Sequence, residues 1–127
     1  MSGQETILLV EDELSLLNLS KKLLEMLGYN VLAADSPGAA LLLAKEHSLG
    51  LRLLMTDVVM PGMSGRELAE NLHAYNPKIK CLYMSGYTAT VMAQHGVIKE
   101  NVNFIQKPFS LQGLATKVRE LLDSEMN

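Results

Sequence analysis

Short apolar runs alternate along the chain with segments in which apolar residues recur at helical spacing. Because short apolar runs are typical of buried strands, we expect strands over residues 7–10, 29–34, 51–56, 79–84 and 102–106. The helical spacing between them predicts helices over residues 14–27, 37–46, 66–75, 88–94 and 111–121. Five such strand–helix units predict an α/β fold with a parallel sheet that is covered by helices on both faces.

Local signals support these helix boundaries. The first helix carries a leucine stripe at helical spacing, which consists of Leu16, Leu19, Leu23 and Leu27. Gly28 is suited to end this helix, and Ser36 is suited to cap the next one, with Pro37 in its first turn. We find no repeat or linker, and the last helix ends near Asn127. We therefore expect residues 1–127 to form a single domain, with no output domain in this chain.

The composition is that of a globular domain. Hydrophobic residues make up 48% and charged residues 20% of the chain, and the net charge of −3 predicts no direct contact with nucleic acid. The eight methionines are scattered and are expected to fill the core. Cys81 is the single cysteine, so an internal disulfide is excluded. With no signal peptide and no apolar stretch of roughly 20 residues, these features predict a cytoplasmic domain without membrane contact.

Chemically useful side chains come directly after four of the predicted strands. Glu11 and Asp12 follow the first strand, Asp57 the third, Ser85 the fourth and Lys107 the fifth. The carboxyl ends of parallel strands lie along one edge of the sheet, where open α/β folds bind their ligands. We therefore expect three carboxylates, one hydroxyl group and one ammonium group to converge there.

These groups are suited to metal-assisted phosphoryl chemistry. Carboxylates without His or Cys favour a hard cation such as Mg²⁺, which also binds phosphate. A carboxylate can act as a nucleophile and form an acyl phosphate, whose oxygens a metal and a lysine would neutralise. Each residue also fits an ordinary role: residues 11–13 as an acidic first helical turn, Asp57 as a turn residue, and Lys107 as a solvated lysine. The functional interpretation depends on their coincidence.

Four segments together resemble the receiver domain of two-component response regulators. They are ILLVEDE at 7–13, DVVMPGMSG at 57–65, YMSGY at 83–87 and FIQKPF at 104–109. The resemblance implies a flavodoxin-like (βα)5 three-layer sandwich with a parallel five-stranded sheet in the order 2-1-3-4-5. It also implies a signalling domain of a phosphorelay, which catalyses only its own phosphorylation and dephosphorylation.

The resemblance further implies a role for individual residues. Asp57 is the implied phosphoacceptor, and the implied cofactor is Mg²⁺ or Mn²⁺. The implied metal ligands are three carboxylates and one backbone carbonyl, from Glu11, Asp12, Asp57 and Val59. The implied phosphate-binding lysine, switch hydroxyl and switch aromatic are Lys107, Ser85 and Phe104. The family often has a cis peptide bond at the position of Lys107–Pro108, and we expect one here.

The resemblance also indicates partners. The implied phosphodonor is a histidine kinase or a histidine phosphotransfer protein, and a downstream partner would read the face made by the fourth helix, the fifth strand and the fifth helix. Segments 85–88, 96–98 and 106–110 look most like receivers at the C-terminus of hybrid sensor histidine kinases; the other possibility is a free-standing regulator. Three departures from the usual pattern are Glu for Asp at Glu11, Ser for Thr at Ser85, and a ring without a hydroxyl at Phe104.

Three other functions fit less well. A haloacid-dehalogenase-like phosphatase needs a second acid two residues after its nucleophile, where this chain has Val59. A flavodoxin-type flavin carrier needs a hydroxyl-rich loop after the first strand, and here that loop is acidic. A receiver that has lost phosphorylation and acts as an interaction module is the remaining alternative. His47, His73 and His95 are too dispersed for a metal site and are expected to be surface residues.

Overall fold

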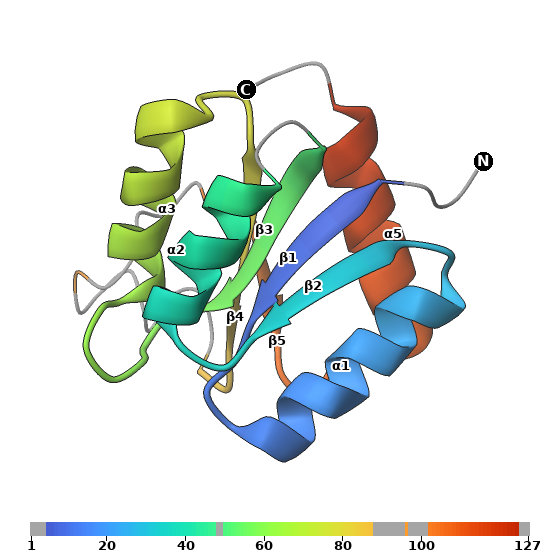
Figure 1. Ribbon diagram of the computed structural model, residues 1–127. Coiled ribbons are helices and arrows are strands. Elements are labelled where there is room, and N and C mark those ends of the chain that lie inside the picture. Colours follow the sequence, from blue (N-terminus) through green and yellow to red (C-terminus); the bar gives the residue numbers. More distant parts are fainter. Residues whose placement is uncertain (1–4, 48–49, 88–95, 97–101, 125–127) are drawn as a thin grey trace.

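The computed structural model describes residues 5–47, 50–87, 96 and 102–124. Its elements follow the predicted alternation (Figure 1) and are, in chain order, β1 (Thr6–Val10), α1 (Leu14–Met26), β2 (Asn30–Ala34), α2 (Pro37–Glu46), β3 (Leu51–Asp57), α3 (Gly65–Tyr75), β4 (Lys80–Ser85), β5 (Phe104–Gln106) and α5 (Leu111–Asp123). The described strands form one parallel sheet in the order β2-β1-β3-β4-β5, which confirms the predicted fold class and strand order. The helix predicted over residues 88–94 lies outside the described residues.

The sheet separates two apolar layers. Helices α2 and α3 cover one face, and α1 and α5 cover the other (Figure 1). Alternate residues of β1 supply both layers: Leu8 and Val10 pack with α2 and α3, whereas Ile7 and Leu9 pack with α1 and α5. Because both faces of the strand are buried, every position of the run is apolar, which is the pattern that predicted it.

The helix boundaries depend on caps that the sequence largely indicated. Gly28 has a φ of 96° and ends α1 in a conformation that favours glycine. The Ser36 hydroxyl accepts a hydrogen bond from the Ala39 N–H at 3.1 Å, as expected of an N-cap. At the start of α3, Ser64 and Glu67 form a reciprocal capping box in which each side chain accepts from the other residue's N–H at 3.1 Å. These caps fix where the helices begin and end.

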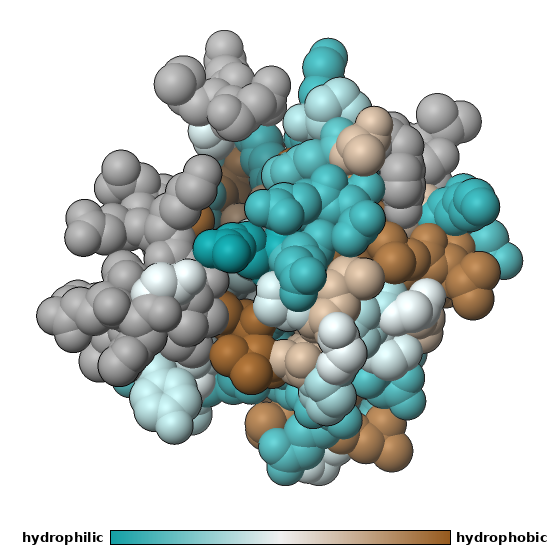
Figure 2. Space-filling model, turned by 90° about the vertical axis from the view of Figure 1, so that its left-hand side faces the viewer, coloured by the Kyte–Doolittle hydropathy of each residue, from teal (hydrophilic) through white to brown (hydrophobic). Residues whose placement is uncertain are grey.

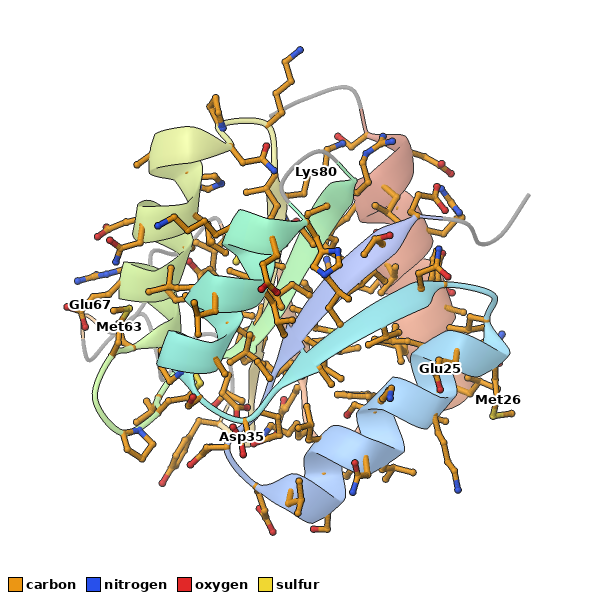
Figure 3. All side chains as sticks on the ribbon, viewed as in Figure 1. Glu25, Met26, Asp35, Met63, Glu67 and Lys80 are labelled. Atoms are coloured by element: carbon orange, nitrogen blue, oxygen red, sulfur yellow. The ribbon has the colours of Figure 1, made fainter. Side chains whose placement is uncertain are left out.

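The leucine spacing predicted α1 correctly, but the buried residues of the helix lie one position later in each turn, at Leu17, Ser20 and Leu24. Of the leucines in the repeat, Leu19 is 53% exposed, whereas Leu23 and Leu27 are partly buried against the core layer of α1 and α5. The expectation that the methionines fill the core was wrong in one case. Met26 points outward from the end of α1 (Figure 3) and is 70% exposed, so not every methionine fills the core.

The outer surface of α3 is polar. Arg66, Glu67 and Glu70 are exposed, and Figure 2, which faces this side of the molecule, shows hydrophilic side chains gathered at its centre. Within the ranges that the structure describes, no helix combines the length and the apolar composition that a bilayer crossing requires.

Candidate functional site

The side chains predicted from the strand ends meet at the carboxyl edge of the sheet. Glu11 follows β1, Asp57 ends β3, Ser85 ends β4 and Lys107 follows β5. They surround a pocket of about 230 Å³, whose lining also includes Asp12, Glu13, Val59 and Tyr87. The parallel register thus brings together groups that are as many as 96 positions apart in the chain.

Lys107 lies between two buried carboxylates. Its Nζ donates a hydrogen bond to Glu11 Oε1 at 2.8 Å and lies 2.6 Å from Asp57 Oδ1. The side chains of Glu11 and Asp57 are only 3% and 7% exposed. Asp57 Oδ1 has this ion-pair contact but no aligned hydrogen-bond donor among the described residues. One oxygen of the buried Asp57 carboxyl group therefore has unused acceptor capacity.

The environment of Asp57 favours its protonated form. Burial, and then the neighbouring Glu11 carboxylate, raise the pKa of Asp57 to about 8, whereas Lys107 acts to lower it. Two carboxylates that share a site with little water cannot both ionise without a large electrostatic cost. In the absence of a metal, Asp57 therefore holds a proton at neutral pH.

Glu11 and Lys107 remain charged beside it. Burial acts to raise the pKa of Glu11, but hydrogen bonds with Asp57, with Lys107 and with the backbone N–H of Glu13 outweigh it and leave the pKa lowered. Burial acts to lower the pKa of Lys107, but the Asp57 and Glu11 carboxyl groups together leave it raised. In the metal-free site, Lys107 therefore lies between the Glu11 anion and the neutral acid of Asp57.

Local contacts that no sequence pattern marks hold the site in place. The buried Thr56 hydroxyl donates to the Asp57 carbonyl at 3.0 Å. The Tyr87 N–H donates to the Ser85 hydroxyl oxygen at 3.0 Å, which leaves the proton of that hydroxyl available for an acceptor. The sequence did not predict these contacts or the one made by the Glu13 N–H. A backbone donor can be supplied by any residue except proline, and no motif marks the Thr56 hydroxyl as a donor to the Asp57 carbonyl.

The donor set fits a hard divalent cation. Carboxylate oxygens of Glu11, Asp12 and Asp57 lie within 4.8 Å of one another. Asp12 is exposed, whereas the other two are buried, so the cluster is open on one side to water. Oxygen ligands of this kind, with no His or Cys among them and room for bound water, are typical of Mg²⁺ sites. The unused acceptor capacity of Asp57 Oδ1 agrees with this assignment.

Phe104 does not line the pocket. It begins β5, where it pairs with Tyr83 of β4 and packs, half-buried, against the core layer of α2 and α3. Two routes link Phe104 to Asp57: strand β4, which pairs with both β3 and β5, and Lys107, which follows β5 and contacts Asp57 directly. The Lys107–Pro108 peptide bond is cis, as the resemblance predicted.

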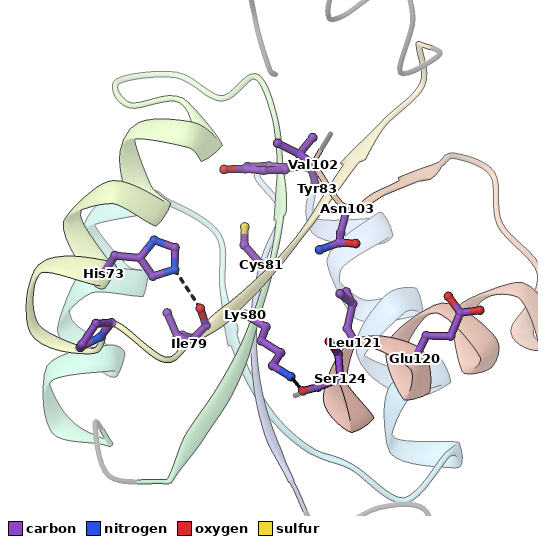
Figure 4. Close-up of a pocket in the computed structure, with 11 residues that line it drawn as sticks. His73, Ile79, Lys80, Cys81, Tyr83, Val102, Asn103, Glu120, Leu121 and Ser124 are labelled. Atoms are coloured by element: carbon purple, nitrogen blue, oxygen red, sulfur yellow. Dashed lines mark hydrogen bonds between the residues drawn. The ribbon is translucent and has the colours of Figure 1, made fainter. Parts of the chain in front are cut away.

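A larger cavity of about 570 Å³ lies at the amino end of β4, beside the ends of α3 and α5 (Figure 4). Two of its polar side chains have partners in the protein: His73 Nε2 lies 2.8 Å from the Ile79 carbonyl oxygen, and Lys80 Nζ donates to the Ser124 carbonyl. None of the site residues predicted from the sequence is among the described residues that line this cavity. The smaller acidic pocket is therefore the candidate functional site.

Comparison with known proteins identifies relatives of this chain. A family model for the response regulator receiver domain matches residues 7–119. The sensor kinase CckA of Brucella abortus (strain 2308) is 37% identical over 125 residues, which are 98% of this chain and 13% of that kinase. The response regulator receiver protein CpdR of the same organism is 31% identical over 116 residues, 91% of this chain and 95% of CpdR.

Solved structures agree with these sequence matches. The crystal structure of the receiver domain from the hybrid histidine kinase CckA has a TM-score of 0.78 and 32% identity to this chain, and the match covers 93% of this chain and 99% of that domain. The family consists of signalling domains, not of enzymes that turn over outside substrates. On its fold, its acidic pocket and these matches, this chain belongs to the response regulator receiver domain family of two-component signalling.

Proposed function

We propose that this domain accepts a phosphoryl group on Asp57 from the phosphohistidine of a histidine kinase or a histidine phosphotransfer protein. One observation carries the proposal: a buried carboxyl group at the centre of the pocket has a lysine 2.6 Å away and two further carboxylates beside it. This is the combination of nucleophile, cation and metal ligands that phosphoryl transfer requires.

The transfer balances as a displacement at phosphorus. A carboxylate oxygen of Asp57 attacks the phosphorus, and the phosphorus–nitrogen bond of the donor breaks. The electron pair of that bond returns to the imidazole nitrogen of the donor, which leaves as neutral histidine after taking up a proton. Because only the ionised carboxyl group is a nucleophile, the proton that Asp57 holds in the metal-free state must leave before the transfer.

A divalent metal, Mg²⁺ or Mn²⁺, would be held by Glu11, Asp12, Asp57 and the backbone carbonyl of Val59. When bound, it would neutralise charge on the carboxylates and on the phosphoryl oxygens. Lys107 and Ser85 supply the remaining contacts in this proposal. Lys107 would exchange its contact with Asp57 for a phosphoryl oxygen, and the Ser85 hydroxyl would donate its free proton to another.

Phosphorylation would act by a shift between two conformations. The Ser85 hydroxyl accepts a hydrogen bond from the Tyr87 N–H, so a movement of this hydroxyl towards the phosphoryl group would also move the segment after β4. Phe104, on the neighbouring strand, would fill the space that this movement vacates. A downstream partner would distinguish the two states on the face that includes β5 and α5; the fourth helix of that face lies outside the described residues. The partner must bind the two states with different affinity for a signal to pass.

An apolar rim around the acidic pocket supports docking of a phosphodonor protein. Val59 and Tyr87 line the pocket and are exposed, and so are Leu14 and Leu111, the first residues of the helices that follow β1 and β5. A rim of this kind excludes water around a transferring group and matches the apolar flank of a helix.

The similarity to CckA supports an origin in a hybrid kinase, and the similarity to CpdR supports a free-standing regulator. In either case we propose a cytoplasmic location without direct membrane or nucleic-acid contact.

Binding of beryllofluoride, a mimic of the phosphoryl group, tests this function. Titration with Mg²⁺ and beryllofluoride, followed by two-dimensional NMR, should show binding that requires the metal and is lost in Asp57→Ala. Amide shifts should spread from the pocket to Phe104 and α5. Binding that persists in Asp57→Ala would contradict the proposed phosphoacceptor. Shifts confined to the pocket would contradict the switch and leave a constitutive interaction module.

A further inference from the structure

The first residue of α3 is in contact with the backbone of Asp57. Gly65 is buried, and its N–H donates to the Val58 carbonyl at 2.8 Å, which closes the loop between β3 and α3. A Cβ atom added at Gly65 would lie 2.1 Å from the Asp57 carbonyl oxygen and 3.1 Å from the Thr56 methyl carbon. No side chain fits at this distance, so only glycine is compatible with the observed position of Asp57.

Space, not backbone conformation, makes Gly65 necessary. Gly65 lies in the helical region, which any residue can adopt. Gly62, in the same loop, is the opposite case: its φ of 88° favours glycine, but nothing lies within 4 Å of an added Cβ. The two glycines of this loop therefore serve different purposes, and only Gly65 adjoins the pocket's central carboxyl residue.

Neither α3 nor the backbone of Asp57 can easily move away from this contact. Helix α3 is held against the core by buried residues at Leu68, Ala69 and Leu72. On the other side, the Asp57 carbonyl accepts from the Thr56 hydroxyl, and the following N–H donates to the carbonyl of Met84 in β4 at 3.1 Å. An added methyl group must move one side by at least about 1.3 Å, because it would lie 2.1 Å from the Asp57 carbonyl oxygen and ordinary contacts begin at 3.4 Å. The loop between them carries the Val59 carbonyl and is exposed at Val59, Pro61 and Gly62, so it has more room to move than β3 or α3.

We propose that Gly65 is a positioning residue, which sets the place of the Asp57 carboxyl group and of the Val59 carbonyl for metal and phosphoryl binding. This inference rests on the proposed function of Asp57. Sites of this kind tolerate errors of about 0.5 Å in the position of their groups, and a misplacement of about 1 Å can cost up to about 100-fold. Gly65→Ala should therefore impair the site far more than it impairs the fold.

The test compares three variants by titration with Mg²⁺ and beryllofluoride and by thermal unfolding. Gly65→Ala adds a methyl group against Asp57. Gly38→Ala adds the same group in the first turn of α2, where nothing lies within 4 Å. Ala69→Gly makes the reverse change one turn further along α3, at a buried position, and should lower stability without touching the loop. The expected result is a loss of affinity between about 10-fold and 100-fold in Gly65→Ala alone, with a folded amide spectrum.

Each other outcome overturns the proposal in a distinguishable way. Equal affinity of Gly65→Ala and wild type would show that the contact does not position the site. A comparable loss in Ala69→Gly would assign the effect to the stability of α3. Failure of Gly65→Ala to fold at low temperature would show that Gly65 is required for the whole fold, because a shift of the loop alone could not relieve the clash between the added methyl group and the Asp57 carbonyl. If the wild type itself does not bind the mimic, the proposed function fails, and this inference fails with it.

Discussion

Replacing Asp57 with Asn should make the metal-free domain more stable at neutral pH. The Asp57 carboxyl group is buried beside Glu11, and its pKa is raised to about 8. An unfolded chain releases this proton near the ordinary pKa of 3.8. Between these two values the folded state binds more protons than the unfolded state, so stability falls as the pH rises. An uncharged amide removes this loss and retains a donor for Glu11.

The size of the effect follows from the pKa. Each tenfold difference in proton affinity is worth about 1.4 kcal/mol, and pH 7 lies about three decades above the ordinary Asp pKa of 3.8. Keeping Asp57 at pH 7 then costs on the order of 4 kcal/mol. The amide is a weaker hydrogen-bond partner for the charged Glu11 and Lys107 side chains than the protonated carboxyl group is, and a hydrogen bond to a charged group is worth about 2 kcal/mol. We therefore expect a net gain of about 2 kcal/mol in the free energy of unfolding.

Urea unfolding in the presence of a chelator measures this difference. The gain of Asp57→Asn over the wild type should be small near about pH 4 and grow towards about pH 8. Asp35→Asn is the matched control, because Asp35 follows β2 at the same edge of the sheet but is exposed. It should show no comparable dependence on pH. A destabilised Asp57→Asn variant, or a gain in stability that is the same at every pH, would show that the raised pKa of Asp57 does not destabilise the domain at neutral pH.

Two further changes have expected outcomes. Lys107→Met leaves Glu11 and Asp57 without a cation, so the free energy of unfolding should fall by about 2 kcal/mol, more at high pH than at low pH. Urea unfolding at two pH values checks this, and an unchanged midpoint would contradict it. Ser64→Ala removes the hydroxyl that caps α3 at Glu67 and should cost about 1 kcal/mol. A urea midpoint equal to that of the wild type would exclude a stabilising cap.

Much of the fold was predictable because the sheet is buried on both faces. Every residue from Ile7 to Val10 faces one of the two apolar layers, so the strand appears in the sequence as an uninterrupted apolar run. The buried face of α1 was not predictable from its leucines, because a helix beside the sheet edge has an apolar flank as well as an apolar core face. Leu19 therefore belongs to the helical pattern and is still exposed.

The chemical groups of the site were also predictable, because parallel strands place their carboxyl ends at one edge. This rule predicted from the sequence alone that Glu11, Asp57 and Lys107 lie close together. The same rule says nothing about contacts made by the backbone. The Thr56 hydroxyl on the Asp57 carbonyl and the close approach of Gly65 depend on atomic distances within a tight loop, which residue types alone do not specify.

Direct labelling tests whether Asp57 accepts a phosphoryl group. The chain would be incubated with a small acyl phosphate such as acetyl phosphate, with Mg²⁺ or with a chelator, and analysed by mass spectrometry of the intact protein and its peptides. We expect one phosphoryl group on the peptide that contains Asp57, and only in the presence of the metal. Hydroxylamine should release it, as it does an acyl phosphate, and the label should be absent in Asp57→Asn. Labelling at another residue, or labelling that Asp57→Asn leaves unchanged, would contradict the proposed phosphoacceptor.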